Sequence, residues 1–215
     1  LLLDLSPSVD FGTLDTQKRT VLVDFVGVLS RLLTRHGNRV GAVMFGSGVQ
    51  HTVPARGGRM HVLRLINDLL KQPRLNRVPM TDLSALIRGG LHSIKKRSLV
   101  FVVSDFISTP GWERSLSLLA QRHEVIAIRL WDPRETTLPD VGHIVLEDAE
   151  TGEQLFVDTS DKKFRQRFVE AAQKREETLA DSFKRAGVDV LSLSTEADLI
   201  HSIASFVMLR RQRRK

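Results

Sequence analysis

Short apolar segments alternate along the chain with longer segments in which apolar residues recur every three or four positions. The short runs are typical of strands, and the longer spacing is typical of amphipathic helices. The run from Leu99 to Ser104 is apolar until its last residue, as expected for a strand buried on both faces. The predicted strands cover residues 1–5, 39–45, 49–53, 99–104, 124–130, 144–146, 154–157 and 188–193, and the predicted helices cover residues 15–35, 59–71, 82–95, 112–122, 162–186 and 196–209.

This order of elements predicts an α/β fold with a doubly wound, mostly parallel sheet of the Rossmann-like kind. The turn Gly46-Ser47-Gly48 predicts an antiparallel hairpin between the second and third strands. A second β-hairpin, at about residues 143–158, is expected as an appendage to the core. Gly37 is placed to end the first helix, and Thr195 is placed to cap the start of the last one.

The 215 residues suffice for one sizeable α/β domain, which we expect at residues 1–209 with a basic tail at residues 210–215. Leu1 lies in what resembles the middle of a strand, so we expect a truncated N-terminus. No apolar run approaches the roughly 18 residues of a transmembrane helix, so no membrane span is expected in this segment. We expect a cytoplasmic location, with an upstream membrane anchor as the open alternative.

The formal net charge is +7, and five of these charges lie in the last six residues, which leaves +2 for the rest. Such a tail is either a solvated helix end or a contact for nucleic acid or acidic lipid. No aromatic residue interleaves with its basic residues, so no nucleic-acid partner is expected. The chain has no Cys, which excludes disulfides and thiolate metal sites.

Oxygen-bearing side chains follow the predicted central strands. Asp4, Ser6 and Ser8 leave the first strand at alternate positions, Asp105 follows the continuously apolar strand, and Thr81 precedes a predicted helix. Carboxylate and hydroxyl oxygens suit Mg²⁺, which prefers near-octahedral oxygen coordination. If the two strands are neighbours, these side chains share one edge of the sheet. Each residue alone has a simpler interpretation as a loop polar group or, for Thr81, a helix cap.

Together, these residues resemble the metal-ion-dependent adhesion site of the von Willebrand factor A family, whose pattern is Asp-x-Ser-x-Ser, then Thr, then Asp. Asp4, Ser6, Ser8, Thr81 and Asp105 match all five positions. Further motifs narrow the resemblance to the bacterial family called domain of unknown function 58, and Asn38, where that family has Asp, departs from it. The matching segments are residues 4–12, 39–45, 104–106, 122–127, 132–135, 138–142 and 150–153.

The resemblance implies a binding module and no catalytic role, so an enzyme is not expected. The five matching residues would hold one Mg²⁺, with Mn²⁺ or Ca²⁺ as alternatives, and an Asp or Glu carboxylate of a protein partner would complete the shell. Members of the family often accompany MoxR-type AAA+ ATPases. The implied partner is therefore such an ATPase or its client, in the assembly or activation of protein complexes.

The main alternative is a Mg²⁺-dependent phosphoester hydrolase, because two carboxylates on a metal ion could activate water. Phosphatases of the haloacid-dehalogenase kind place a second Asp two positions after the first, where this chain has Ser6. The chain has no phosphate-binding loop of the P-loop type, and its seven His residues have no metal-pair spacing. A structural scaffold with an empty site is a third alternative, which metal analysis would separate from the first.

Overall fold

The computed structural model describes residues 1–12, 16–75, 81–149 and 151–213, and its elements follow the predicted order closely. The strands are β1 (Leu2–Asp4), β2 (Val40–Phe45), β3 (Val49–Arg56), β4 (Leu99–Ser104), β5 (Glu124–Trp131), β6 (His143–Glu147), β7 (Gln154–Asp158) and β8 (Asp189–Ser194). The helices are α1 (Lys18–Arg35), α2 (Arg59–Leu70), α3 (Leu83–Ser93), α4 (Trp112–Arg122), α5 (Lys162–Ala186) and α6 (Leu199–Arg213), with 3-10 turns η1 (Pro7–Asp10) and η2 (Pro133–Glu135).

Six strands form one sheet in the order β3-β2-β1-β4-β5-β8. Neighbouring strands are parallel except β3, which runs antiparallel to β2. The predicted α/β class with a mostly parallel sheet is therefore confirmed. β1 lies between β2 and β4, so the strand order reverses beside the first strand of the chain. In doubly wound sheets this reversal opens a crevice at the carboxyl ends of the strands.

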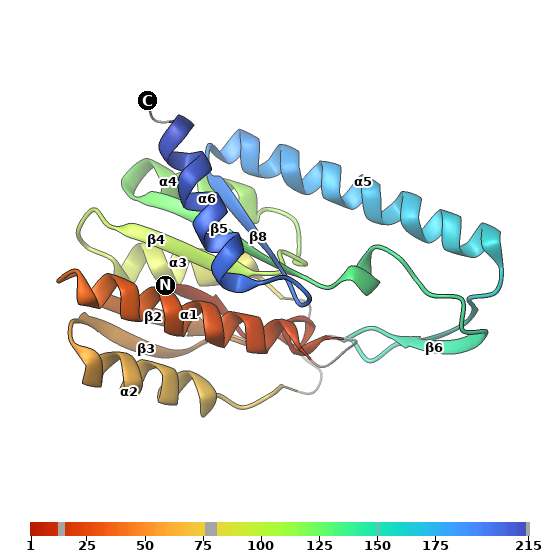
Figure 1. Ribbon diagram of the computed structural model, residues 1–215, viewed down its shortest axis with the longest axis horizontal. Coiled ribbons are helices and arrows are strands. Elements are labelled where there is room, and N and C mark those ends of the chain that lie inside the picture. The colour runs from red at the N-terminus through yellow and green to blue at the C-terminus, as the bar shows by residue number, and fades with distance from the viewer. Residues whose placement is uncertain (13–15, 76–80, 150, 214–215) are drawn as a thin grey trace.

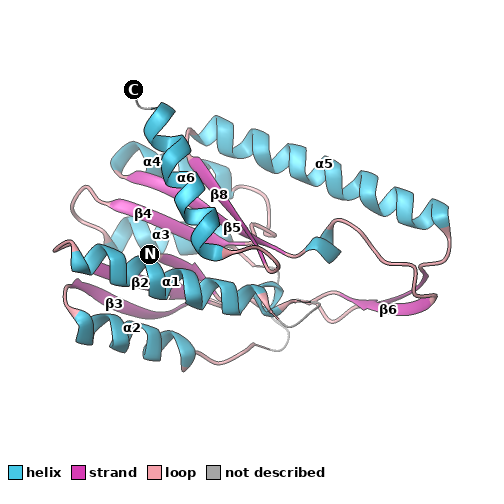
Figure 2. Ribbon diagram, viewed as in Figure 1, coloured by secondary structure: helices cyan, strands magenta, loops and turns pink. Residues whose placement is uncertain are grey.

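Helices cover both faces of the sheet, and each face has its own apolar core. Figures 1 and 2 show α1 and α6 in front of the strands, with α3 and α4 behind them. Successive strand residues alternate between the two cores, as strand geometry requires. Leu3 and Val103 pack with α1, whereas Leu2 and Val102 pack with α3 and α4. Burial on both faces explains why these strands are continuously apolar.

A separate two-stranded antiparallel sheet, β6 and β7, extends from the main body beside the start of α5 (Figure 1). The pairing joins His143 to Asp158 and Glu147 to Gln154. Asp161 begins α5 by accepting a hydrogen bond from the backbone N–H of Lys163 at 2.8 Å. The 25-residue helix then returns along the body and ends at Gly187, whose φ of 67° is left-handed.

The predicted cap of the last helix is wrong. Thr195 does not cap it; its Oγ1 donates a 2.8 Å hydrogen bond to the carboxylate of Asp132. The helix begins three residues later than predicted, at Leu199, and Asp198 accepts a 2.7 Å hydrogen bond from the backbone N–H of His201. The physical reason is that Asp132 is only 1% exposed, and a buried carboxylate requires hydrogen-bond donors.

The residues predicted as a basic tail are largely helical. α6 continues through Arg213, and Arg210 pairs with Asp189 at 2.6 Å and with Glu124 at 2.7 Å. Arg210 therefore joins the helix to strands β8 and β5. Other predictions concern residues outside the described ranges, namely the start of the first helix at residue 15, position 150 of the family motif and residues 214–215 of the tail.

The approach of α3 to β1 depends on a glycine. A Cβ added at Gly90 would lie 2.6 Å from Cδ1 of Leu2, well inside van der Waals contact. Leu2 is fully buried, so it has little space into which it could move. Because Leu2 is two residues before Asp4, this contact also fixes the strand that carries the first candidate site residue.

We predict that Gly90→Ala destabilises the protein by about 1–3 kcal/mol, because the new methyl group overpacks Leu2. Gly27→Ala in α1 is the matched control, since its Cβ would meet only an ordinary contact of 3.5 Å with Ile66. Helix propensity should make the control neutral or stabilising by up to about 1 kcal/mol. Urea unfolding measures the free energy of unfolding of both variants. An equal change in the two variants would contradict the overpacking of Leu2.

Candidate functional site

The carboxyl ends of β1 and β4 bring Asp4 and Asp105 to neighbouring positions. Leu3 pairs with Val103 in the parallel register, so the residues that follow, Asp4 and Ser104, lie side by side. Ser104 Oγ donates a 2.6 Å hydrogen bond to Asp4 Oδ2. Asp4 is fully buried and Asp105 is only 3% exposed. Two carboxylates are thus held in the interior at the point where the strand order reverses.

The loop after β1 folds back onto Asp4. The backbone N–H of Ser6 donates to Asp4 Oδ1 at 3.0 Å, and the Oγ atoms of Ser6 and Ser8 lie 3.1 Å apart. Pro7 opens the 3-10 turn η1, which suits its fixed φ. Both serines are buried. The alternate spacing seen in the sequence therefore places one carboxylate and two hydroxyls in a single buried cluster.

Asp105 is held by a buried lysine. Lys18 Nζ lies 2.7 Å from Asp105 Oδ2 and 2.6 Å from Glu135 Oε1, and the lysine is only 1% exposed. The other oxygen of Asp105 accepts the backbone N–H of Ile107 at 3.0 Å. Burial alone would lower the pKa of Lys18, but attraction to the two carboxylates and their hydrogen bonds raise it above its usual value. The side chain is therefore charged.

Thr81 joins the same region through the loop that follows Asp105. Its carbonyl oxygen accepts the backbone N–H of Thr109 at 3.0 Å and the Oγ of Ser108 at 2.8 Å. Thr81 is 2% exposed and lies two residues before the start of α3 at Leu83. Asp82, rather than Thr81, caps that helix by accepting from the backbone N–H of Ala85. The simpler interpretation of Thr81 as the helix cap is therefore wrong.

The electrostatic environment of Asp4 is unfavourable to its charge. Burial, and then the nearby carboxylate of Asp105, raise the pKa of Asp4 from 3.8 to about 6, although hydrogen bonds from Ser104 and Ser6 oppose the rise. Two buried carboxylates that repel each other are the arrangement that a bound cation would relieve. The available donors are carboxylate and hydroxyl oxygens, which are the ligands of hard cations. Among the described residues, no group of three or more His, Cys, Asp or Glu side chains could hold a metal ion, so hydroxyls would be needed.

Sequence reasoning missed three residues of this region: Lys18, Ser104 and Glu135. Lys18 could have been found, because it lies on the same helical stripe as the buried Leu22 and Phe25, where a charge is unexpected. Glu135 is fixed by the turn η2, in which its Oε2 accepts the backbone N–H of Asp132 at 3.1 Å. Nothing in the sequence pairs Glu135 with a lysine 117 positions earlier.

The backbone beside Asp105 is in an uncommon conformation. Phe106 has a φ of 60°, a value rare for bulky residues. Its N–H donates to Ser104 Oγ at 2.9 Å, and its ring packs against Trp112 and Phe183 with centroids 5.3 and 4.8 Å away. These contacts hold the turn, which directs Asp105 toward Lys18. Uncommon backbone geometry of this kind is concentrated at functional sites.

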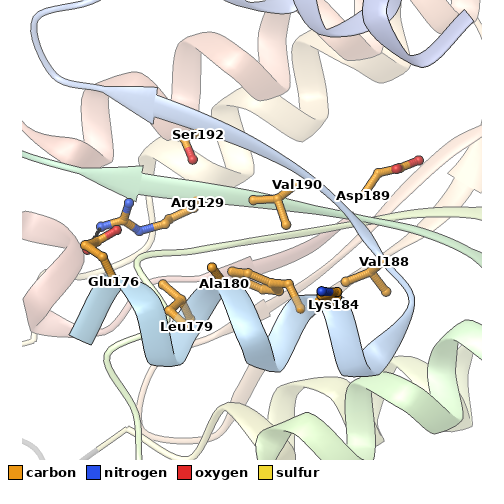
Figure 3. A pocket seen from close by; sticks show the side chains of 10 residues that line it. Arg129, Glu176, Leu179, Ala180, Lys184, Val188, Asp189, Val190 and Ser192 are labelled. Atoms are coloured by element: carbon orange, nitrogen blue, oxygen red, sulfur yellow. Dashed lines mark hydrogen bonds and ion pairs between the residues drawn. The ribbon is translucent and has the colours of Figure 1, made fainter. Parts of the chain in front are cut away.

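A hollow of about 560 Å³ lies between α5 and the strands β5 and β8 (Figure 3). At one end Arg129 meets Glu176 with a nitrogen–oxygen distance of 2.5 Å, and Val190 and Ser192 line the strand side. None of its lining residues belongs to the Asp4 cluster. The hollow nevertheless adjoins the carboxylate region, because a smaller cavity shares its Arg129, Glu176 and Leu179 and is also lined by Asp105 and Glu135.

The fold and site define a class: α/β proteins with a candidate ligand site at the carboxyl edge of a mostly parallel sheet. The family model described as "Protein of unknown function DUF58" matches residues 1–178. The chain belongs to the DUF58 family.

Relatives of this chain include mycobacterial proteins described as uncharacterized. Uncharacterized proteins from Mycobacterium tuberculosis and Mycobacterium bovis are each 34% identical over 214 residues, which cover 99% of this chain and 67% of theirs. An uncharacterized protein from Mycobacterium avium is 36% identical over 160 residues, which cover 74% of this chain and 94% of its own length.

Two solved structures share the fold. A conserved hypothetical protein, BatB from Bacteroides thetaiotaomicron, matches with a TM-score of 0.59 and 13% identity, covering 99% of this chain and 96% of that one. An aerotolerance-related membrane protein from Bacteroides fragilis matches with a TM-score of 0.58 and 12% identity, covering 97% and 94%. At such identities the likeness concerns the fold alone. Within the described ranges of this chain, no helix combines the length and apolar character needed to cross a membrane.

We predict that Asp4→Asn stabilises the protein in the presence of a chelator at pH 7.5. With a pKa raised from 3.8 to about 6, the folded state binds more protons than the unfolded state between these values, so stability falls as pH rises through that window. Removing the charge should recover up to about 3 kcal/mol above pH 6, at roughly 1.4 kcal/mol per pKa unit. The gain should shrink as pH falls toward 4.

Urea unfolding of both proteins at several pH values measures this gain. Asp181→Asn is the control, because Asp181 is an exposed carboxylate on α5. An Asp4→Asn protein that is no more stable than the parent at pH 7.5 would show that the buried charge carries no cost.

Proposed function

We propose that this chain is a metal-dependent protein-binding module of the von Willebrand factor A kind. In this proposal Asp4, Ser6, Ser8, Thr81 and Asp105 form an adhesion site for Mg²⁺, with Mn²⁺ or Ca²⁺ as alternatives. The observation that carries it is the buried cluster at the ends of β1 and β4, where Ser104 and Ser6 hold Asp4 and the two serine hydroxyls lie 3.1 Å apart.

The donor chemistry supports this proposal. The carboxylates of Asp4 and Asp105 are already engaged by hydrogen bonds and by Lys18, so the neutral hydroxyls are the natural direct ligands. When bound, the cation would supply an open coordination position for an anionic oxygen. The chain's own part is to hold the hydroxyls and carboxylates in place and to limit the access of water. An Asp or Glu side chain of a partner protein is the ligand that fits such a position.

The partner in this proposal is a MoxR-type AAA+ ATPase or its client, and the role is the assembly or activation of protein complexes. This choice rests on what the sequence resemblance implies about members of the DUF58 family, to which the chain belongs. A partner that consumes ATP accords with a cytoplasmic location for this segment. The proposal assigns no catalytic step to the chain.

We predict that the chain captures the MoxR-type ATPase of its own bacterium in Mg²⁺ and loses it in EDTA. Asp4→Ala and Asp105→Ala should each weaken capture by at least about tenfold, because ligands and their supporting groups each change metal affinity by 10–100-fold. Asp181→Ala is the matched control, since Asp181 is an exposed carboxylate on α5 and is not part of the proposed site. Circular dichroism checks that each variant is folded.

Equal capture in Mg²⁺ and in EDTA would contradict the proposed function. So would a loss in Asp181→Ala as large as that in Asp4→Ala, because it would indicate a general effect of surface charge. Replacing Mg²⁺ by Mn²⁺ or Ca²⁺ in the same assay ranks the three cations.

A further inference from the structure

Lys18 is a buried cation in direct contact with the candidate site. It is the first residue of α1, it is 1% exposed, and its Nζ touches carboxylate oxygens of Asp105 and Glu135 at 2.7 and 2.6 Å. The Nζ also lies 5.7 Å from the ring centroid of Phe11, which follows the serine loop. Thus, three separate segments of the site region converge on one ammonium group.

This placement is unfavourable for a lysine unless the carboxylates hold it. A cation at the start of a helix opposes the helix dipole, and burial removes its hydration. The structure compensates with a preorganised acceptor: Glu135 uses one oxygen for the ammonium and the other for the backbone N–H of Asp132. Asp105 likewise has one oxygen on Lys18 and one on Ile107 N–H. The ammonium is therefore a fixed charge and not a mobile side chain.

We propose that Lys18 is a positioning residue that limits the affinity of the adhesion site for divalent cations. This inference rests on the proposed function. The ammonium neutralises part of the negative charge of Asp105 and would repel a dication held by the same carboxylate. Because the group is buried, solvent and salt screen this repulsion weakly. A partner carboxylate would add negative charge and so tighten the cation binding that the chain alone supports weakly.

The proposal predicts that substitutions of Lys18 and of Glu135 change the cation affinity of the site in opposite directions. Lys18→Gln removes the positive charge that pairs with Asp105, so the site should bind cations more tightly. Glu135→Gln removes the carboxylate that shares the ammonium, so the charge of Lys18 acts on Asp105 alone and cation binding should weaken. If the ion pair between Lys18 and Glu135 is purely structural, both variants should lose stability, and added cations should restore the stability of neither variant.

The test is calorimetric titration of the chain with Mn²⁺, a stand-in for Mg²⁺, in parallel with thermal unfolding. We expect Lys18→Gln to lower the Kd for Mn²⁺ by about tenfold or more, because a buried charge in contact with Asp105 is weakly screened. Glu135→Gln should raise the Kd several-fold. Without metal, Lys18→Gln should have a lower Tm than the parent, and saturating Mn²⁺ should raise its Tm by more than it raises that of the parent.

Arg19→Gln is the matched control. Arg19 is the next residue of α1 and is also buried, but it contacts Asp10 and the carbonyl oxygen of Gln72 and not Asp105. A gain in Mn²⁺ affinity in this control equal to that in Lys18→Gln would overturn the role of Lys18. So would an unchanged Kd for Mn²⁺ in Lys18→Gln or in Glu135→Gln. Metal uptake by Lys18→Gln but not by the parent would support that role and overturn the proposed function. No uptake by any variant would overturn both.

Discussion

Two carboxylates buried at the ends of adjacent central strands are the constraint that the rest of the structure satisfies. A buried charge is costly unless it is paired and hydrogen-bonded. Asp4 meets this demand with a hydroxyl from Ser104 and a backbone N–H from Ser6, whereas Asp105 relies on Lys18. The raised pKa of Asp4 indicates that the compensation is incomplete. The remaining cost is what distinguishes this region from an ordinary buried ion pair.

The strand order explains why these charges meet at all. The chain leaves β1 toward β2 and β3 on one side and later crosses to β4, β5 and β8 on the other. The reversal lies between β1 and β4, and loops diverging from these strands leave room at their carboxyl ends. Asp4 and Asp105 stand on either side of that point. The loop carrying Ser6 and Ser8 and the segment of Thr81, tied to Ser108 and Thr109, surround it.

The sequence alone predicted the features of the fold that depend on the local pattern of apolar and polar residues. The apolar run of β4 gave its bounds correctly, and the α/β class followed from the alternation of elements. Contacts between distant segments could not be predicted in this way, because no local signal links Lys18 to Asp105 and Glu135, 87 and 117 positions away. Thr195 shows the same limit: its sequence context favours a helix cap, but the buried carboxylate of Asp132 takes its hydroxyl. Tertiary demands override local preference where a charge is buried.

The donor set also bears on which cation such a site could select. The chain has no Cys, and the cluster around Asp4 offers only carboxylate and hydroxyl oxygens. Transition metals that favour thiolate or imidazole gain little from these groups, whereas Mg²⁺, Mn²⁺ and Ca²⁺ are suited to them. Lys18 would add to this preference for hard dications, because its ammonium neutralises part of the negative charge of the site and so weakens the binding of cations with low charge density. In the proposed adhesion site, ligand chemistry and the adjacent ammonium would thus favour a hard dication that is retained best when an anionic oxygen from outside the chain joins the shell.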